Sequence, residues 1–187
     1  MIDGDIMSKV TTALLDHEPD MKSFSCGEVS IDQMIGEAYL NHLIRKSMTF
    51  QIMFRGISIG YYQLTIENIY LGESNLEFAD CGTGENKYGY LSINFLAIRK
   101  EIQRQGIGTS VLRHILSEAI ELSKKWPIRL VYIEALQDKV EWYKSIGFEN
   151  LYDGEPADKF GLVPMFYELM TPGDKEAFED YCISKTV

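Results

Sequence analysis

The stretch Phe95-Leu96-Ala97-Ile98-Arg99-Lys100-Glu101-Ile102-Gln103-Arg104-Gln105-Gly106-Ile107-Gly108-Thr109 decides the fold. Its first residues complete an apolar run that begins at Ile93, as expected for a strand that is covered on both faces. After a polar turn, apolar residues recur three and four positions apart, which is typical of one face of a helix. Those residues are Ile107, Val111, Ile115, Ala119 and Leu122, and Pro127 would stop the helix. The stretch predicts a buried strand, a glycine-bearing turn and one long helix.

The turn between the strand and the helix has the chemistry of a phosphate site. A helix N-terminus carries unpaired N–H groups and a partial positive charge. Gly106 and Gly108 would let a pyrophosphate approach those groups closely. The turn matches neither the P-loop pattern nor the dinucleotide pattern. A glycine-rich connection without a ligand is the alternative reading of the turn taken by itself.

Two motifs give this stretch a family context. Leu96-Ala97-Ile98, a spacer of four residues and Gln103-x-x-Gly106-x-Gly108 resemble the acetyl-CoA signature of the GNAT N-acetyltransferases. Downstream of an apolar run at 130–135, Trp142-Tyr143-Lys144-Ser145-Ile146-Gly147-Phe148 resembles the closing segment of the same family. Gly60-Tyr61-Tyr62-Gln63-Leu64 resembles its third strand. The order and separation of these motifs identify the chain as a member of the GNAT superfamily.

The resemblance implies a set of cofactor-binding residues and a proton donor. Backbone groups near the strand end would lie beside the pantetheine and thioester, and the turn would take the pyrophosphate of acetyl-CoA. The residues assigned to the co-substrate in this way are Leu96, Ala97, Ile98, Gln103, Arg104, Gln105, Gly106, Ile107, Gly108 and Thr109. Tyr143 matches the family's general acid, which protonates the departing thiolate. The alternative for Tyr143 is a packed aromatic residue of the core.

The general base is left open by the sequence. Glu134 is the nearest carboxylate along the second strand, and it could equally be a solvent-facing charge. Asn94 stands where some members of the family carry a glutamate, and an amide cannot abstract a proton. A water relay or an amine that arrives neutral would serve as well. Many members have a cofactor-contacting asparagine after this strand; here that position is Leu136, and the neighbouring Gln137 or Asp138 could take over the contact.

The N-terminal part carries a second, shorter resemblance. Phe24-x-Cys26-Gly27-x-x-x-Ile31-Asp32 resembles the opening of a GNAT subgroup that includes bacterial toxins acetylating aminoacyl-tRNA. Ser30 is the expected N-cap of a helix over Ile31–Leu43, which in that subgroup helps to wall the acceptor site.

The fold class implied is α/β, a GNAT fold with a mixed central sheet of about six or seven strands flanked by helices. Its fourth and fifth strands, which are parallel, would splay apart to admit the co-substrate. One GNAT domain would span residues 1–187, with 170–187 as a C-terminal helical extension. The other expected elements are a strand or short helix at 10–15, a hairpin of Met48–Phe54 and Ile57–Ile66, a strand at 128–135, a helix at 138–146, a final strand at 163–170, a terminal helix at 172–184, and a loop from Gly72 to Tyr88.

Composition limits the partners. The 187 residues suit one domain, and 28 Asp and Glu against 18 Lys and Arg give a net charge of −10. This charge argues against a broad nucleic-acid-binding face and suits a small-molecule or protein amine as acceptor. The three cysteines and three histidines are scattered, so we expect no metal. The sequence has no apolar run long enough for a membrane span and no signal-peptide pattern at its N-terminus, so we expect a cytoplasmic protein.

The function predicted from the sequence is N-acetyl transfer from acetyl-CoA to a primary amine, by direct attack in a ternary complex. No cysteine lies in a nucleophile motif, which argues against an acyl-enzyme. Two alternatives stay open: acetylation of aminoacyl-tRNA by a toxin-type enzyme, and a non-catalytic acyl-CoA-binding module. A monomer and a homodimer are both open.

Overall fold

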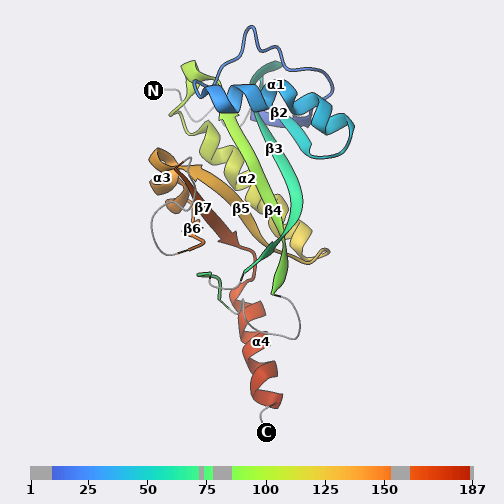
Figure 1. The fold of residues 1–187 in the computed structure, drawn as a ribbon, viewed down its shortest axis with the longest axis vertical. Coiled ribbons are helices and arrows are strands. Elements are labelled where there is room, and N and C mark those ends of the chain that lie inside the picture. Colours follow the sequence, from blue (N-terminus) through green and yellow to red (C-terminus); the bar gives the residue numbers. More distant parts are fainter. Residues whose placement is uncertain (1–9, 72–73, 78–85, 153–160, 186–187) are drawn as a thin grey trace. The chain divides into compact units, whose positions relative to one another are not determined.

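The computed structural model describes residues 10–71, 74–77, 86–152 and 161–185 (Figure 1). Seven strands form a sheet in the order β1-β2-β3-β4-β5-β7-β6. The chain divides into two compact units. The first contains the described residues up to Glu67 together with Leu91–Glu118, and the second contains those of 68–90 and from Ala119 onward. The expected α/β class with a mixed sheet is confirmed, because β4 runs parallel to β5.

The first unit begins with a strand and a helix. β1 spans Val10–Leu14, which settles the choice between strand and helix at this segment. α1 spans Val29–Leu43, so it starts two residues before the expected Ile31. Ser30 is therefore inside the helix, and the expectation that it is the N-cap is wrong. Glu28 holds the cap position without a side-chain hydrogen bond.

A hairpin of two long strands follows. β2 spans Met48–Phe54 and β3 spans Ile57–Tyr70, paired antiparallel, with Phe54 opposite Ile57. Arg55 and Gly56 form the turn with φ values of +50° and +79°, which is the left-handed conformation that a tight hairpin needs. β1 pairs with the outer edge of β2, with Val10 opposite Phe54.

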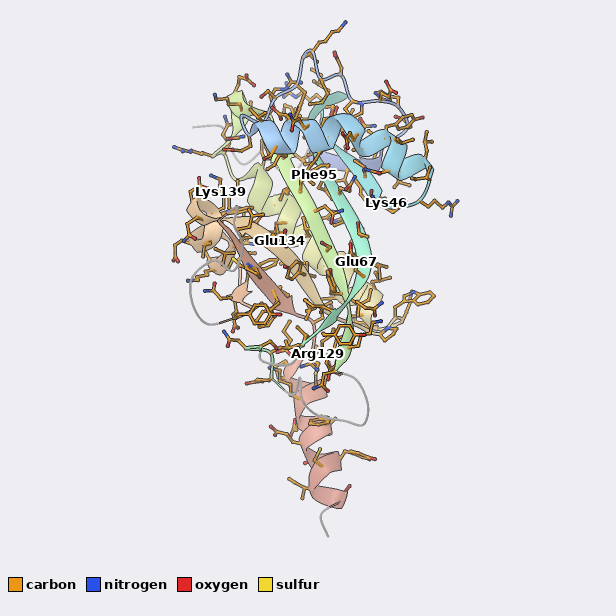
Figure 2. The ribbon with its side chains drawn as sticks, viewed as in Figure 1. Lys46, Glu67, Phe95, Arg129, Glu134 and Lys139 are labelled. Carbon is orange, nitrogen blue, oxygen red and sulfur yellow. The ribbon has the colours of Figure 1, made fainter. Side chains whose placement is uncertain are left out.

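The central unit of strand, turn and helix is as expected from the sequence. β4 spans Lys87–Ile98, a short 3₁₀ turn spans Lys100–Ile102, and α2 spans Ile107–Ser123. α1 covers β3 and β4 through a cluster that includes Ile35, Ala38, Tyr61, Phe95 and Ala97, with Phe95 on β4 beneath the helix (Figure 2). These side chains are 0–4% exposed, so the last part of β4 is held rigidly.

The second unit contains the remaining strands. β5 spans Ile128–Leu136, β6 spans Glu149–Asn150 and β7 spans Leu162–Glu168, with β7 antiparallel to both. Its core contains Leu71, Tyr90, Leu130, Leu151 and Phe166. A Cβ at Gly89 would lie 2.5 Å from the carbonyl oxygen of Pro127, so β4 approaches the start of β5 too closely for any side chain there.

Two helices of the second unit differ in length. A 3₁₀ turn at Gln137–Lys139 precedes α3, which spans only Val140–Lys144, and so the helix expected at 138–146 is shorter. α4 spans Pro172–Lys185, and it extends from the end of β7 (Figure 1). Within the described ranges, no helix is long and apolar enough to cross a membrane. Most of the expected loop at 72–88 lies outside the described residues.

An ion-pair cluster fixes the start of α4. The Glu168 carboxylate accepts hydrogen bonds from Arg129 at 2.5 Å and from Lys175 at 2.7 Å, and Lys175 also pairs with Glu77. The side chains of Arg129 and Glu168 are only 14% and 17% exposed, so solvent screens this pair less than a surface pair. Arg129 is labelled in Figure 2 at the start of β5.

We expect Glu168→Gln to lower the free energy of unfolding by about 1–3 kcal/mol, because the substitution leaves the partly buried Arg129 without its carboxylate partner and leaves Lys175 with Glu77 alone. Urea unfolding followed by circular dichroism measures this change. Glu121→Gln is the matched control, since its pair with Lys124 is exposed, and we expect no measurable change in its unfolding midpoint. Equal unfolding midpoints for the two variants would contradict the assignment of the cluster as an anchor.

Candidate active site

The predicted phosphate site is the turn from Gln103 to Thr109, which we call the cradle. It lies wholly in the first unit, after the end of β4. The Arg99 N–H donates to the Ile59 carbonyl at 2.8 Å, and the Lys100 N–H donates to the Ser25 carbonyl at 3.0 Å. These bonds hold the exit of β4 between β3 and the segment before α1. The chain then passes through an exposed turn, residues 103–106, into α2.

The N-terminus of α2 is open to solvent. Gly106 has a φ of +82°, and a Cβ built on it meets no atom within 4 Å. The carbonyl of Gly106 accepts the first helical hydrogen bond, from the Ser110 N–H at 3.0 Å. The N–H groups of the first helical turn after Gly106, such as those of Ile107 and Gly108, have no acceptor inside the helix, and an anion is favoured at such a helix end.

The backbone conformation of this turn is unusual at a second residue. Arg104 has a φ of +60°, which L-residues other than glycine adopt at a cost of roughly 1 kcal/mol. Such conformations persist where the surrounding structure requires them, and they gather at binding sites. The structure thus brings together Arg104, Gln105, Gly106, Ile107 and Gly108 around one helix end. A pyrophosphate fits this opening in charge and in space.

Gln103 has a structural contact that the sequence did not reveal. Its side-chain amide donates to the Cys26 carbonyl at 2.7 Å and to the Ile98 carbonyl at 2.9 Å. The residue therefore ties the segment before α1 to the end of β4. Its assigned contact with the co-substrate stays a prediction, and the side-chain nitrogen is already engaged.

The segment assigned to the thioester is rigid. Ala97 and Ile98 are buried, and Leu96 is half-buried. A Cβ at Gly60 would lie 2.4 Å from the Ala97 carbonyl oxygen, so β3 can pass this close only with glycine at that position. The motif Gly60–Leu64 thus has a steric role against β4.

Two consecutive residues of β4 face the same side of the sheet. Asn94 donates to the side chains of Gln63 and Thr65, which lie on the face of β3 that also carries Tyr61. Phe95 packs with Tyr61 in the cluster beneath α1. Regular strands alternate faces, so this arrangement indicates a β-bulge at Asn94 and Phe95. A bulge leaves a backbone group without a strand partner, and that group is available to a ligand.

Tyr143, the candidate acid, lies in the second unit on α3. Its ring is 6% exposed, and it lies 4.5 Å from the Trp142 ring and 5.4 Å from the Phe148 ring. Burial raises the pKa of the Tyr143 phenol above its ordinary value. The phenol therefore stays protonated at neutral pH, as a proton donor requires, and it does not act as a base.

Glu134, the candidate base, is exposed on β5 (Figure 2). Its carboxylate accepts a hydrogen bond from the Tyr132 hydroxyl at 3.3 Å. Burial, together with the negative charge of Glu134, raises the pKa of Tyr132. Leu136 stands where many family members have an asparagine. Two residues further on, Asp138 pairs with its neighbour Lys139. None of these contacts assigns a general base.

The segment before α1 is organised by Asp32. This carboxylate accepts hydrogen bonds from the Ser25 hydroxyl at 2.6 Å and from the Cys26 N–H at 2.9 Å. Burial opposes ionisation of Asp32, but these hydrogen bonds outweigh it and lower its pKa. Among the described residues, no cluster of His, Cys, Asp and Glu has the arrangement of a metal site.

The comparisons with known proteins agree with this geometry. Residues 65–150 match the family model described as the acetyltransferase (GNAT) domain. Over these residues the chain matches a GNAT acetyltransferase domain, which supports an acyltransferase. A search of curated protein sequences gives no match.

Solved structures of toxins have the same fold. The chain is similar to one titled as a bacterial toxin, with 20% identity and a TM-score of 0.73 over 91% of this chain and 95% of that one. It is also similar to AtaT complexed with acetyl-methionyl-tRNAfMet, with 20% identity and a TM-score of 0.71 over 85% and 94%. A third is AtaTR bound with AcCoA, with 19% identity and a TM-score of 0.69 over 91% and 99%. At this identity the likeness concerns the fold.

We expect Cys26 to resist alkylation at neutral pH. It is 7% exposed, and burial, with Asp32 as a further cause, raises the pKa of its thiol to about 11. Only the thiolate reacts, so the rate should rise through the alkaline range toward that pKa. Iodoacetamide labelling of a Cys81→Ser variant, read by peptide mass spectrometry, should modify the exposed Cys182 first. Modification of Cys26 at pH 7.5 as fast as that of Cys182 would show that this thiol is reactive.

Proposed function

We propose that this protein is an acetyl-CoA-dependent N-acetyltransferase that acetylates a primary amine by direct attack in a ternary complex. The observation that carries the proposal is the open N-terminus of α2, which lies directly after the buried end of β4. In this arrangement the exposed N–H groups of residues 105–108 bind the pyrophosphate of acetyl-CoA. The glycines leave room for its oxygens, and the helix dipole favours its charge.

The residues divide the chemistry between holding and proton transfer. Backbone groups of Leu96, Ala97 and Ile98 hold the pantetheine arm and polarise the thioester carbonyl, as the resemblance implies. The amine nitrogen forms a bond to the carbonyl carbon while the carbon–sulfur bond breaks. The amine loses its proton to solvent, and Tyr143 gives a proton to the departing thiolate. This assignment needs a phenol that is protonated at neutral pH; a tyrosine meets this with its ordinary pKa, and burial of Tyr143 raises that pKa further.

The amine of an aminoacyl-tRNA is the acceptor that we propose to test first. AtaT complexed with acetyl-methionyl-tRNAfMet has the same fold, and the segment from Phe24 to Asp32 resembles that subgroup. The net charge of −10 is unevenly divided: the unit with α4 has 17 acidic and 9 basic residues. The unit with the cradle has 11 acidic and 9 basic residues. The negative net charge argues against nucleic-acid binding, but most of it lies outside the unit that carries the cradle. The argument is therefore weaker for that unit.

We expect the double variant Gly106→Glu and Gly108→Glu to lose the binding of both acetyl-CoA and CoA, because the new carboxylates fill the opening and repel phosphate. Calorimetric titration measures the binding. Gly56→Glu is the matched control: its φ is +79° and its Cβ also meets no atom within 4 Å, but it lies in the hairpin turn. Unchanged binding by the double variant would remove the cradle from the proposal.

We expect Tyr143→Phe to lower kcat for acetyl transfer by about 10²–10³-fold, since it removes the proton donor and keeps the ring. The affinity for acetyl-CoA should stay within about twofold of wild type. Transfer of labelled acetyl groups to methionyl-tRNA and to a panel of small amines measures both the rate and the acceptor. Tyr167→Phe is the control, because Tyr167 also packs against the Phe148 ring and also loses only its hydroxyl. A wild-type protein that binds acetyl-CoA and acetylates nothing would favour the non-catalytic binding module.

A further inference from the structure

A chain of side-chain hydrogen bonds crosses three strands of the first unit and ends at α1. Asn94 on β4 donates to the Gln63 Oε1 at 3.0 Å, and Gln63 on β3 donates through Nε2 to the Thr49 Oγ1 at 3.0 Å. Thr49 on β2 donates to the Ala38 carbonyl of α1 at 3.5 Å. Gln63 and Thr49 are 5% and 0% exposed, so water does not compete for these bonds.

The last acceptor determines the direction of the whole chain. A backbone carbonyl can only accept, so in the contact between Thr49 and Ala38 the Thr49 hydroxyl is the donor. Its oxygen then accepts from Gln63 Nε2, which leaves Oε1 of Gln63 as an acceptor for Asn94. Reversing one of the two amides alone would place two donors or two acceptors against each other, which is unfavourable for buried groups.

Asn94 is therefore held in one orientation. Both hydrogens of its amide nitrogen are used, one by Gln63 and one by the Thr65 Oγ1 at 2.8 Å. Its Oδ1 takes no hydrogen bond among the described residues, and it is not among their buried oxygens that lack a partner. Since Asn94 is half-buried, this oxygen is within reach of solvent. The side chain thus presents only an acceptor outward.

The position of this acceptor on β4 relates it to the proposed reaction. Asn94 is at the bulge, two residues before Leu96, the first residue assigned beside the thioester. We propose that Asn94 Oδ1 binds the incoming amine by accepting one of its N–H hydrogens, and that Thr49 and Gln63 are positioning residues for that contact. The inference rests on the proposed function and extends it to acceptor selection: the acceptor presents an N–H donor at this point.

In the proposed reaction, the amine is bound by Asn94 but is deprotonated by water. Asn94 aligns the nitrogen lone pair toward the carbonyl carbon and takes no proton, because a carboxamide oxygen is not a base at physiological pH. The amine proton leaves to water. A substrate with a carboxylate or carbonyl oxygen at the same point would face an acceptor and be rejected.

Steady-state kinetics with methionyl-tRNA tests this contact. We expect Asn94→Leu to raise KM for the acceptor about tenfold, the value of one hydrogen bond from a charged or strongly polar group. KM for acetyl-CoA and the shape of the pH–rate profile should not change. Thr49→Val should raise the same KM about threefold, because Gln63 loses its acceptor and both amides can reverse. Thr11→Val, the same change on exposed β1, should leave it unchanged. A KM within twofold of wild type for both Asn94→Leu and Thr49→Val overturns the inference.

Nuclear magnetic resonance reads the orientation without turnover. The side-chain amide signals of Asn94, assigned by their loss in Asn94→Asp, should exchange with solvent at least about tenfold more slowly than those of an exposed asparagine. They should shift when methionine methyl ester is added to the complex with CoA. Fast exchange, or no shift, overturns the inference even in an active enzyme. If wild type acetylates no amine but the signals are protected and shift, the proposed function fails while the Asn94 contact stands.

Discussion

The close approach of β3 to β4 at Gly60 and Ala97 is the constraint on which the first unit depends. With no side chain at residue 60, the two backbones meet, and the Arg99 N–H reaches the Ile59 carbonyl just beyond. The next residue, Lys100, is bonded to Ser25. Any larger residue at 60 would separate the strands and release both bonds. The cradle follows the end of β4 in the chain. Its position therefore depends on Gly60, which lies on β3.

The same pair of strands determines the polar character of the site. Below α1, apolar side chains such as Phe95 and Tyr61 fix the strands, while Asn94, Gln63 and Thr49 form a line of amides and a hydroxyl on the same face. The two sets can share a face only because the bulge turns two consecutive residues of β4 the same way. The apolar packing thus holds β3 and β4 in place, and the hydrogen bonds set the orientation of the amide side chains.

Much of this fold could be predicted from the sequence, because its signals are local. The period of the long helix, the Arg55-Gly56 turn and the strand before Gln103 each follow from neighbouring residues. The start of α1 could not, because the cap position is held by Glu28 without a side-chain hydrogen bond, and Asp32 inside the helix accepts from Ser25 and Cys26, seven and six residues earlier in the chain. The short α3 follows a 3₁₀ turn that has no clear sequence signal.

For the candidate site, the sequence predicts which residues lie near each other along the chain, and their roles stay predictions. The cradle residues are contiguous, and the structure places them around one helix end. The contacts of Gln103 with Cys26 and of Asn94 with Gln63 join residues 77 and 31 positions apart, so no local pattern reveals them. The one available signal is the alternation of polar residues at 49 and 51 and at 63 and 65, of which Thr49 and Gln63 lie opposite each other in the hairpin.

The aromatic neighbours of Tyr143 have a consequence for spectroscopy. The chain contains two tryptophans: Trp126 is 62% exposed, and the Trp142 ring lies 4.5 Å from that of Tyr143. Replacing Trp126 with phenylalanine would leave a single indole beside the candidate acid. Its fluorescence would then report on the surroundings of the Trp142 ring, so the protein carries its own optical probe next to the candidate acid.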